Sequence, residues 1–386
     1  MPGLIRRIVA RRNEAAAANA QRRREHRLHL SPRALADPDF LAQFRLAPMA
    51  VEELITEIGG TLEEALTPRN RRGNRGRPIP LSTVVCIGLK YLGHNTTFRD
   101  LAVQFGTSLG TVQRCIDGFV FAVIGICTPR EVVFPPPNTA DVMQAFKARR
   151  GIPHIVGAVD GCHVRLAGRP PGVVNADAFY CRKGFFSLNC LFIVSPDLTI
   201  SYAFSRYGGS SHDSFILRRS HLWDQLNRVD GLLPNRGGFP AKLLGDAGYP
   251  LMPNLLTPYS RGAGGAVDED SFGVLKSRFR CLHTGLRVDI DQASRVIAAS
   301  VTLHNMARRR HWRAIREEND GDDGLAMGNG RNALLGFNDV EQMVLAEDPA
   351  TLRNVRTSAA MKALAKRRRD QLAALLALVR VAGVDQ

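Results

Sequence analysis

The sequence predicts two structural classes in one chain: an all-α N-terminal region with a helix-turn-helix, followed by a mixed α/β region. Residues 81–127 carry apolar residues at helical spacing, which predicts three helices. A proline run from Pro135 to Asn138 then marks a boundary, because prolines interrupt regular structure. Beyond it, short apolar runs typical of buried strands alternate with helical patterns, and this order indicates a mixed α/β fold.

The composition is that of a folded and strongly basic protein. With 386 residues and 45% apolar content, the chain can form two or three domains with hydrophobic cores. Lys and Arg number 52 against 36 Asp and Glu, so the formal charge of +16 predicts a polyanionic partner such as nucleic acid or an anionic membrane surface. The longest apolar run, Phe119–Cys127, is well short of the roughly 20 residues that cross a bilayer. We therefore expect DNA as the partner and no membrane.

The cysteines and the first residues indicate a reducing compartment. The seven cysteines include no Cys-x-x-Cys pair, which argues against a disulfide framework and a structural zinc site. Arginines stand where a secretory peptide would need its apolar segment. We expect the nucleus, with the cytosol as the alternative. The P-loop, zincin and nucleophile-elbow motifs are also absent from the sequence, so those enzyme classes lack support.

Changes in composition predict four segments. Residues 1–36 form a basic arm, with eight arginines against two glutamates in the first 30 residues. Residues 37–134 form the helical DNA-binding region, 150–312 the α/β domain, and 313–386 an acidic loop with a helical tail. The arm is either solvated or a phosphate-binding and nuclear-import segment.

The helical region contains a basic linker. A helix is predicted over Pro48–Ile58 from one apolar face. Residues 67–80 then combine Pro and Gly with five arginines and no acid, a composition suited to lying along a phosphate backbone. The candidate DNA-binding residues of the linker are Arg71, Arg72, Arg75 and Arg77.

Helix-turn-helix spacing follows the linker. Thr97 is a candidate cap of the first helix, Gly106 supplies the tight turn, and Ser108 caps the second helix. The exposed face of the second helix presents Gln113 and Arg114, which can meet phosphates or base edges in a major groove. The alternative is a helical pair that never touches DNA.

In the α/β region, a hairpin with its turn at residues 195–197 lies between two buried strands. The predicted elements are a strand over Ile155–Val159, hairpin strands over Ser187–Val194 and Ile200–Phe204, a helix over Ser214–Leu226, a strand over Lys242–Leu244, and helices beginning near Asp268 and Asp291.

Four acids occur where this order would bring them together. Asp160 and Asp246 end two strands, Asp213 follows the hairpin, and Glu269 opens a helix. Clustered carboxylates repel one another unless hard divalent cations neutralise them, which predicts a Mg²⁺ or Mn²⁺ site. Each acid also has a structural alternative: Asp213 as a helix cap, Asp160 and Asp246 as turn residues, and Glu269 as a partner of the helix dipole. The apolar periodicity of the last helix does not choose between Glu269 and Asp268.

At these residues the chain resembles the PIF/Harbinger transposase family and the DDE superfamily nucleases derived from it. The matching stretches, in the family's order, are GAVDGCHV, YCRKGFFSLN, YGGSSHDSFIL, LLGDAGYP, SFGVLKSRFRCL and LHN. The helix-turn-helix and the NRGRP segment before it also resemble the family's DNA-binding region. The combination is far more specific than any one motif.

The resemblance implies a ribonuclease H-like DDE nuclease domain with Asp160, Asp246 and Glu269 as the catalytic triad and Asp213 as a further metal ligand. Glu269 is preferred over Asp268 because the family's Glu lies three residues before a Phe-Gly pair, here residues 272–273. The implied reaction is hydrolysis of DNA with two divalent cations, and in a full transposase also strand transfer. A homo-oligomer and a separate DNA-binding partner protein are compatible with this resemblance.

Two cations and two departures complete the sequence picture. Arg182 and Lys183 are suited to holding substrate phosphates, with ordinary surface charge as the alternative. Cys181 stands where the family has Asn, and Asp270 where it has Arg. These departures motivate a second hypothesis, a domesticated DNA-binding protein that has lost catalysis. A phosphohydrolase of small molecules is a third, weaker hypothesis.

Overall fold

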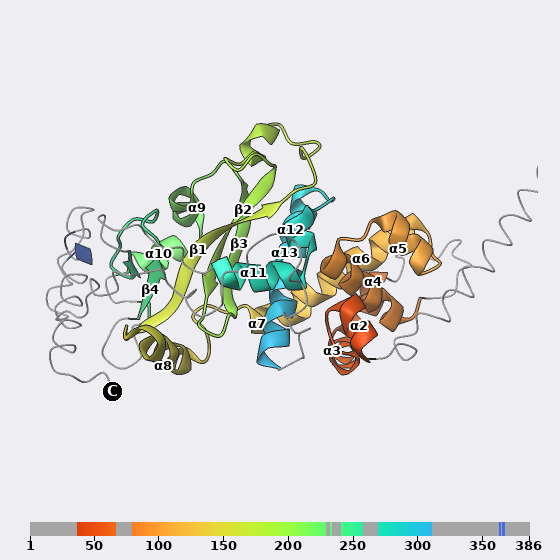
Figure 1. Ribbon diagram of the computed structural model, residues 1–386, viewed down its shortest axis with the longest axis horizontal. Helices are drawn as coiled ribbons and strands as arrows, with labels where there is room; N and C mark the ends of the chain where they lie inside the picture. Colours follow the sequence, from red (N-terminus) through yellow and green to blue (C-terminus); the bar gives the residue numbers. More distant parts are fainter. Residues whose placement is uncertain are drawn as a thin grey trace, which may run out of the picture. The chain divides into compact units, whose positions relative to one another are not determined.

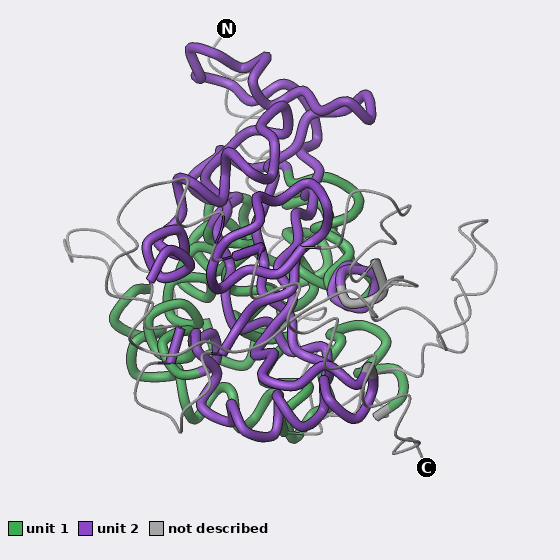
Figure 2. The backbone as a smooth tube through the Cα atoms, turned by 90° about the vertical axis from the view of Figure 1, so that its left-hand side faces the viewer, with its two compact units in different colours: residues 1–130, 277–286, 295–321 green, residues 131–276, 287–294, 322–386 purple. Residues whose placement is uncertain are grey.

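The computed structural model describes most of the two predicted regions, and the chain divides into two compact units (Figure 2). Unit 1 comprises Met1–Arg130, Ser277–Leu286 and Arg295–Gly321, and unit 2 comprises Glu131–Lys276, Arg287–Ser294 and Asp322–Gln386. The described residues are 37–66, 79–228, 232–233, 241–257, 269–310, 363, 365 and 366. The predicted basic arm, the arginine linker and nearly all of the C-terminal tail lie outside the described residues.

Unit 1 is helical (Figure 1). Its helices are α2 (Asp37–Phe44), α3 (Pro48–Leu66), α4 (Leu81–His94), α5 (Phe98–Gln104), α6 (Leu109–Ala122), a π-helical turn (Val123–Cys127), α7 (Thr128–Glu131), α12 (Cys281–Thr284) and most of α13 (Ile290–Arg309). The predicted helix that begins at Pro48 extends beyond Ile58, because Leu62 continues its buried face.

The local signals of the α5–α6 pair are confirmed. The Thr97 side chain accepts a hydrogen bond from the Asp100 N–H at 3.2 Å, and the Ser108 side chain accepts one from the Thr111 N–H at 3.2 Å. Gly106, between the helices, has a φ of 58°, a conformation that glycine adopts without steric cost. Gln113 and Arg114 are exposed on α6, as predicted.

One continuous helical stretch, Leu109–Glu131, is long and apolar enough to cross a membrane by length and composition alone. It is longer than the nine-residue apolar run seen in the sequence, but 44% of its apolar window is buried inside the protein. A single stretch of this kind is weak evidence for a membrane, since the core helix of a soluble protein passes the same test.

Unit 2 is built on a five-stranded mixed sheet, which confirms the α/β class. The strands are β1 (Ile155–Arg165), β2 (Ser187–Val194), β3 (Ile200–Gly208), β4 (Lys242–Gly245) and β5 (Leu255–Leu256), in the order β3-β2-β1-β4-β5. The β1–β2 and β2–β3 pairs are antiparallel, whereas β1–β4 and β4–β5 are parallel. The hairpin turn lies where predicted, with Asp197 Oδ1 accepting from the Thr199 N–H and hydroxyl.

The helices of unit 2 correct one prediction. They are α8 (Thr139–Arg150), a short 3-10 helix (Ala176–Phe179), α9 (Asp213–Arg219), α10 (Leu222–Leu226) and most of α11 (Glu269–Arg278). The single helix predicted over Ser214–Leu226 is wrong, because it breaks at Ser220. This residue is extended, and its hydroxyl donates to the Leu217 carbonyl at 2.8 Å, so a side chain satisfies a group that a further helical turn would have paired.

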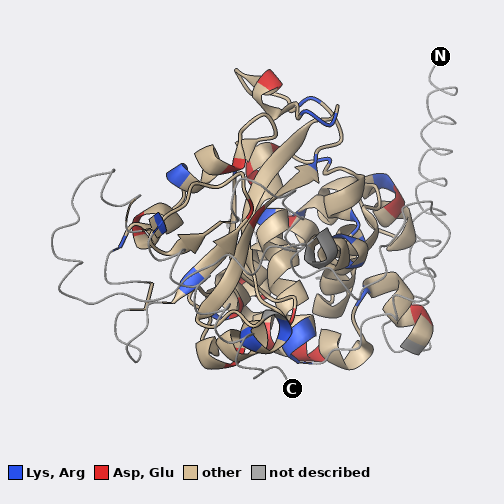
Figure 3. Ribbon diagram, turned by 60° about the vertical axis from the view of Figure 1, so that its left-hand side comes forward, with Lys and Arg blue, Asp and Glu red and all other residues tan. Residues whose placement is uncertain are grey.

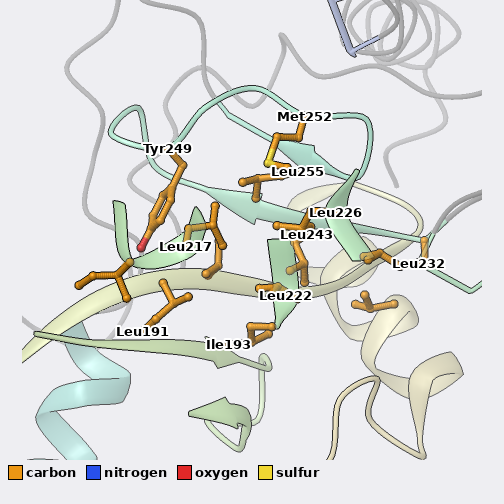
Figure 4. Packing of buried hydrophobic residues seen from close by; sticks show 14 residues of the cluster. Leu191, Ile193, Leu217, Leu222, Leu226, Leu232, Leu243, Tyr249, Met252 and Leu255 are labelled. Carbon is orange, nitrogen blue, oxygen red and sulfur yellow. The ribbon is translucent and has the colours of Figure 1, made fainter. Parts of the chain in front are cut away.

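The sheet is covered on both faces, since successive side chains of a strand point in opposite directions. On one face Leu191 and Ile193 of β2 join an apolar cluster with residues of α9, α10, β4 and β5 (Figure 4). On the other face Phe192 contacts Phe272 of α11, with ring centroids 5.4 Å apart. This second contact fixes α11 against the centre of the sheet.

Candidate active site

Strand register brings Asp160 and Asp246 to the same place. Val159 of β1 pairs with Gly245 of β4 in parallel, and each acid is the next residue of its chain. Because β4 ends at Gly245, Asp160 lies where β1 extends past its neighbour. Adjacent strands are about 4.8 Å apart, so residues at equal register are close neighbours. Both acids are half-buried.

Asp213 of α9 lies beside Gly161, the residue that follows Asp160. A Cβ atom built on Gly161 would lie 2.6 Å from Asp213 Cγ, so the carboxylate occupies the space that a side chain at residue 161 would need. Asn189 Nδ2 of β2 donates to Asp213 Oδ1 at 2.7 Å and to the Ser211 carbonyl at 2.9 Å. His212 holds the cap position of α9, without a side-chain cap bond. Asp213 is therefore not the helix cap.

Glu269 is placed by its helix. It is the first residue of α11, and Phe272, three residues later, packs on Phe192. Phe192 is the antiparallel register partner of Asp160. Phe272 therefore packs on the strand neighbour of Asp160, and the backbone of Glu269 lies about one helical turn before Phe272. The side chain of Glu269 and all of Asp268 lie outside the described residues, so the choice between them stays a prediction.

The charges of the cluster act on one another. Burial raises the pKa of Asp246, and the nearby charge of Asp213 raises it further, against hydrogen bonds from the N–H groups of Gly248 and Tyr249. The Gly248 bond to Asp246 Oδ1 measures 3.0 Å, so the turn role expected for this acid is also present. Burial and a like charge thus act in the same direction on Asp246, as expected for a half-buried carboxylate near a second acid without a counterion.

The donor set fits a hard divalent cation. Three half-buried carboxylates offer only oxygen ligands, which Mg²⁺ and Mn²⁺ prefer. Two buried polar atoms beside them, Tyr249 Oη and Asn189 Oδ1, have no hydrogen-bond partner within the described residues. In the same part of the chain no three His, Cys, Asp or Glu side chains already form a metal-binding group. These residues are therefore of the types that bind such a metal, but the described side chains do not already form a complete coordination site.

Two exposed cations, Arg182 and Lys183, act on a histidine on which Asp213 also acts. Arg182 and Lys183 are exposed in a turn closed by the Cys181 N–H bond to the Phe185 carbonyl. Burial lowers the pKa of His163, and the charges of Lys183, Lys276 and Arg182 lower it further while Asp213 acts in the opposite direction. The predicted phosphate-binding pair thus lies within electrostatic range of a histidine that also senses Asp213.

The other predicted DNA-binding residues belong elsewhere in the chain. Gln113 and Arg114 lie on α6 of unit 1, and Arg114 Nε donates to the Gly110 carbonyl of its own helix at 3.3 Å. The linker arginines, Arg71, Arg72, Arg75 and Arg77, lie outside the described residues. Of the predicted DNA-binding residues that are described, only Arg182 and Lys183 share unit 2 with the acids.

Sequence reasoning missed four residues of the site. Gly161 admits Asp213, Asn189 orients it, Lys276 donates to the His163 carbonyl at 2.8 Å, and Tyr249 is buried beside the acids. All four stand inside the motif stretches quoted above, yet nothing in the spacing of those motifs assigns them a contact. The departure at Cys181 is buried, and its carbonyl accepts from the Gly184 N–H at 3.0 Å.

Comparison with known proteins identifies the part of the chain that contains these acids. Residues 159–270 match the family model of the DDE superfamily endonucleases. The match begins one residue before Asp160 and ends one residue after Glu269, so it encloses all four predicted acids.

Curated relatives extend the similarity beyond this domain. The chain is 24% identical over 266 residues to an ALP1-like protein of Arabidopsis thaliana, covering 62% of this chain and 63% of that protein, which is less than two thirds of its length. It is 26% identical over 257 residues to HARBI1 of Homo sapiens, a candidate nuclease by name (62% and 70%). Against HARBI1 of Xenopus laevis, identity is 23% over 286 residues (69% and 77%). No solved structure matches the chain. The chain therefore carries a DDE superfamily endonuclease domain and is homologous to the ALP1-like and HARBI1 proteins, the Harbinger transposase-derived nucleases.

Proposed function

We propose that the protein is a metal-dependent DNA endonuclease whose α/β domain has the ribonuclease H-like fold of DDE nucleases. The observation that carries the proposal is the register that puts Asp160 and Asp246 on neighbouring strands, with the Asp213 carboxylate beside Gly161, the residue after Asp160. The strand order β3-β2-β1-β4-β5, with β2 antiparallel to both of its neighbours, supports the fold. The enclosing endonuclease match supports the reaction class.

The acids would hold the cations. Asp160, Asp213, Asp246 and Glu269 are the proposed ligands of two Mg²⁺ or Mn²⁺ ions, which supply acidification of the attacking water and stabilisation of the leaving 3′ oxygen. Asn189 fixes the carboxylate plane of Asp213 by its 2.7 Å bond, and the Gly248 N–H does the same for Asp246 at 3.0 Å. Held carboxylates lose less freedom on binding, so these neighbours preorganise the ligand set.

The flanking cations would hold the substrate. Arg182 and Lys183 are exposed, and their charges act on the same histidine as that of Asp213, so they can place a phosphate beside the acids. His163 is not needed as a base: burial lowers its pKa, and its Nδ1 lies 3.1 Å from Ser187 Oγ. With a lowered pKa and a hydrogen-bond partner on β2, His163 has a structural role in the sheet rather than a role in proton transfer.

Unit 1 is proposed to bind DNA through the α5–α6 helix pair. Gln113 and Arg114 are exposed on α6, and the linker arginines precede this pair in sequence. The formal charge of +16 supports a polyanion as partner, and the nucleus is the compartment proposed for this activity. Strand transfer after cleavage, a homo-oligomer and a partner protein remain further proposals from the resemblance.

Cleavage of supercoiled plasmid by the full chain, with Mn²⁺ or Mg²⁺, tests the proposal. Asp160→Asn keeps the shape of the side chain but removes its charge, and should reduce the cleavage rate by about 10²–10³-fold or more. Asp224→Asn, an equal change at an exposed position of α10, is the matched control and should leave the rate unchanged.

Two outcomes would contradict the proposal. Cleavage that survives Asp160→Asn would show that other groups carry the reaction. DNA binding without cleavage at any metal concentration would favour the domesticated DNA-binding protein instead.

A further inference from the structure

Tyr249 is a buried residue whose hydroxyl lacks a hydrogen-bond partner among the described residues. Its side chain is 4% exposed, and Oη makes no hydrogen bond within the described part of the chain. Figure 4 shows the ring among the apolar side chains of the core cluster, with its hydroxyl directed away from Met252 and Leu255. A buried hydroxyl without a partner is costly, and phenylalanine would fill the same space without that cost. Packing alone therefore does not explain why residue 249 is Tyr rather than Phe.

The ring lies at the strand ends that carry the acids. The Tyr249 N–H donates to the Asp246 carbonyl at 3.2 Å, which ties the residue to the turn after β4. A Cβ atom on Gly245 would lie 3.2 Å from Tyr249 Cδ2 and 3.3 Å from Val159 Cγ1. Val159 and Gly245 are the residues immediately before Asp160 and Asp246, so the ring packs against the base of the acidic cluster.

Three carboxylates act on this hydroxyl. Burial raises the pKa of Tyr249, and the charges of Asp213, Asp160 and Asp246, in that order of effect, raise it further. The hydroxyl therefore keeps its proton and is a donor near three carboxylates, none of which it bonds in this structure. Asp213, the acid that acts on it most strongly, already receives one hydrogen bond on Oδ1 from Asn189, which leaves its other oxygen for a second donor.

We propose that Tyr249 is a positioning residue whose hydroxyl, without a bond to a described residue in the metal-free structure, donates to the Asp213 carboxylate when the divalent cation binds and, with Asn189, holds that carboxylate in the occupied site. This inference rests on the proposed function, because it assigns Tyr249 a role only if the acids hold a metal. Donors that hold metal-ligating carboxylates typically change metal affinity by 10–100-fold when removed. This hydrogen bond sets how tightly the metal binds rather than the chemistry after binding.

Tyr249→Phe in the full chain removes the hydroxyl and keeps the ring. The matched control is Tyr202→Phe: Tyr202 on β3 packs against the same core cluster, and no carboxylate contributes to its raised pKa. Three quantities are measured for each variant: the Kd for Mn²⁺ by titration calorimetry, the rise in Tm on adding Mn²⁺, and plasmid cleavage as a function of Mn²⁺ concentration.

We expect Tyr249→Phe to raise the Mn²⁺ Kd about tenfold and to reduce the metal-induced rise in Tm. Cleavage should require correspondingly more Mn²⁺ and recover at saturating metal. The metal-free Tm should be equal to or above that of the wild type, since the hydroxyl lost has no partner there. Tyr202→Phe should leave the Mn²⁺ Kd unchanged.

Three results would overturn the inference while leaving the proposed function intact. These are a wild-type Mn²⁺ Kd in Tyr249→Phe, an equal loss of affinity in Tyr202→Phe, and a metal-free Tm clearly below that of the wild type, which would give the hydroxyl a structural bond instead. Failure of the wild-type chain to bind Mn²⁺ in a manner sensitive to Asp160→Asn would instead remove the proposed function itself.

Discussion

The carboxylate of Asp213 approaches β1 because residue 161 is glycine. Any larger residue at this position would meet the Asp213 carboxylate, with its Cβ 2.6 Å from Cγ. Asn189 holds the Asp213 carboxylate by a hydrogen bond of 2.7 Å. The Asp213 side chain therefore cannot simply turn aside to make room for a Cβ atom at residue 161. The lack of a Cβ atom at residue 161 therefore leaves the space that the Asp213 carboxylate occupies.

Gly161→Ala should therefore displace Asp213. We expect about a tenfold or greater loss of Mn²⁺ affinity, a similar or larger loss of plasmid cleavage, and a cost of about 1–3 kcal/mol in the free energy of unfolding, as for overpacked positions. Calorimetry, the cleavage assay and denaturant unfolding measure these quantities. Gly168→Ala, where an added Cβ meets nothing within 4 Å, is the control. Wild-type metal affinity in Gly161→Ala would mean that Asp213 is not a ligand.

At the scale of elements, α11 is held on the sheet at two points. Phe272 packs on Phe192 of β2, and Lys276, one turn later, donates to the His163 carbonyl of β1 at 2.8 Å. Two contacts on different strands fix both the position and the rotation of a helix. The place of Glu269 at the start of α11 is therefore set by packing farther along the same helix.

The junction of α2 and α4 in unit 1 contains a histidine that resists protonation. Burial, with the charges of Arg45 and Lys90, lowers the pKa of His94 to about 4, and its Nε2 lies 3.1 Å from the Ala42 carbonyl. The folded state therefore binds fewer protons than the unfolded state between pH 4 and the ordinary pKa of 6.5. This contribution to stability is complete above pH 6.5 and is lost as the pH falls toward 4.

His94→Gln should reduce this loss, because glutamine keeps a donor for Ala42 and does not titrate. We expect the wild-type chain to lose about 1–2 kcal/mol more than the variant between pH 7 and pH 4.5, once solvent screening is allowed for. Denaturant unfolding at the two pH values measures the difference. Identical pH dependence in both proteins would show that the pKa of His94 is the same in the folded and unfolded states.

At the scale of the whole molecule, unit 1 is assembled from distant parts of the chain. Asn95 Nδ2 donates to the Thr284 hydroxyl and to the Gly285 carbonyl, both at 2.8 Å. Thr128 and Thr302 share a hydrogen bond of 2.7 Å. Deleting the N-terminal helices would strip the segments after residue 277 of these partners. DNA binding by unit 1 is therefore tested better by point substitutions in the full chain than by truncation.

Among the described residues, the positive charge is spread rather than gathered. In Figure 3, Lys and Arg are scattered over many helices and loops. Charge alone therefore does not identify the surface that meets DNA. Arg182 and Lys183 are exposed cations whose charges act on His163, the histidine on which Asp213 also acts.

Replacing both Arg182 and Lys183 by Ala should weaken DNA binding and reduce the slope of log K against log salt by about 2, because each of the two cations would neutralise one phosphate. Binding titrations of the full chain at several salt concentrations measure the slope. Replacing Lys147 and Arg149, exposed on α8, by Ala removes the same charge and is the control. Equal effects of the two double variants would show that Arg182 and Lys183 act only as ordinary surface charge.

Features set by neighbours in the chain were predictable. The caps Thr97 and Ser108, the turn at Gly106 and the bounds of β2 follow from local propensities and from alternation of apolar residues, and the structure has them as expected. The motif order also predicted the family. Such signals survive in the sequence because the physical cause and its effect lie within a few residues of each other.

Other features depend on which distant segments meet. The break of a helix at Ser220, the short strand β5, the space at Gly161 for Asp213, and the unpartnered hydroxyl of Tyr249 beside three acids follow from register and packing. Register is a property of two strands at once, and a shift of one residue would turn every side chain to the other face. By itself the sequence determined the fold class, the family and the candidate acids, whereas only the tertiary structure decided which neighbours hold those acids in place, because these contacts join segments whose separation along the chain leaves no local signal.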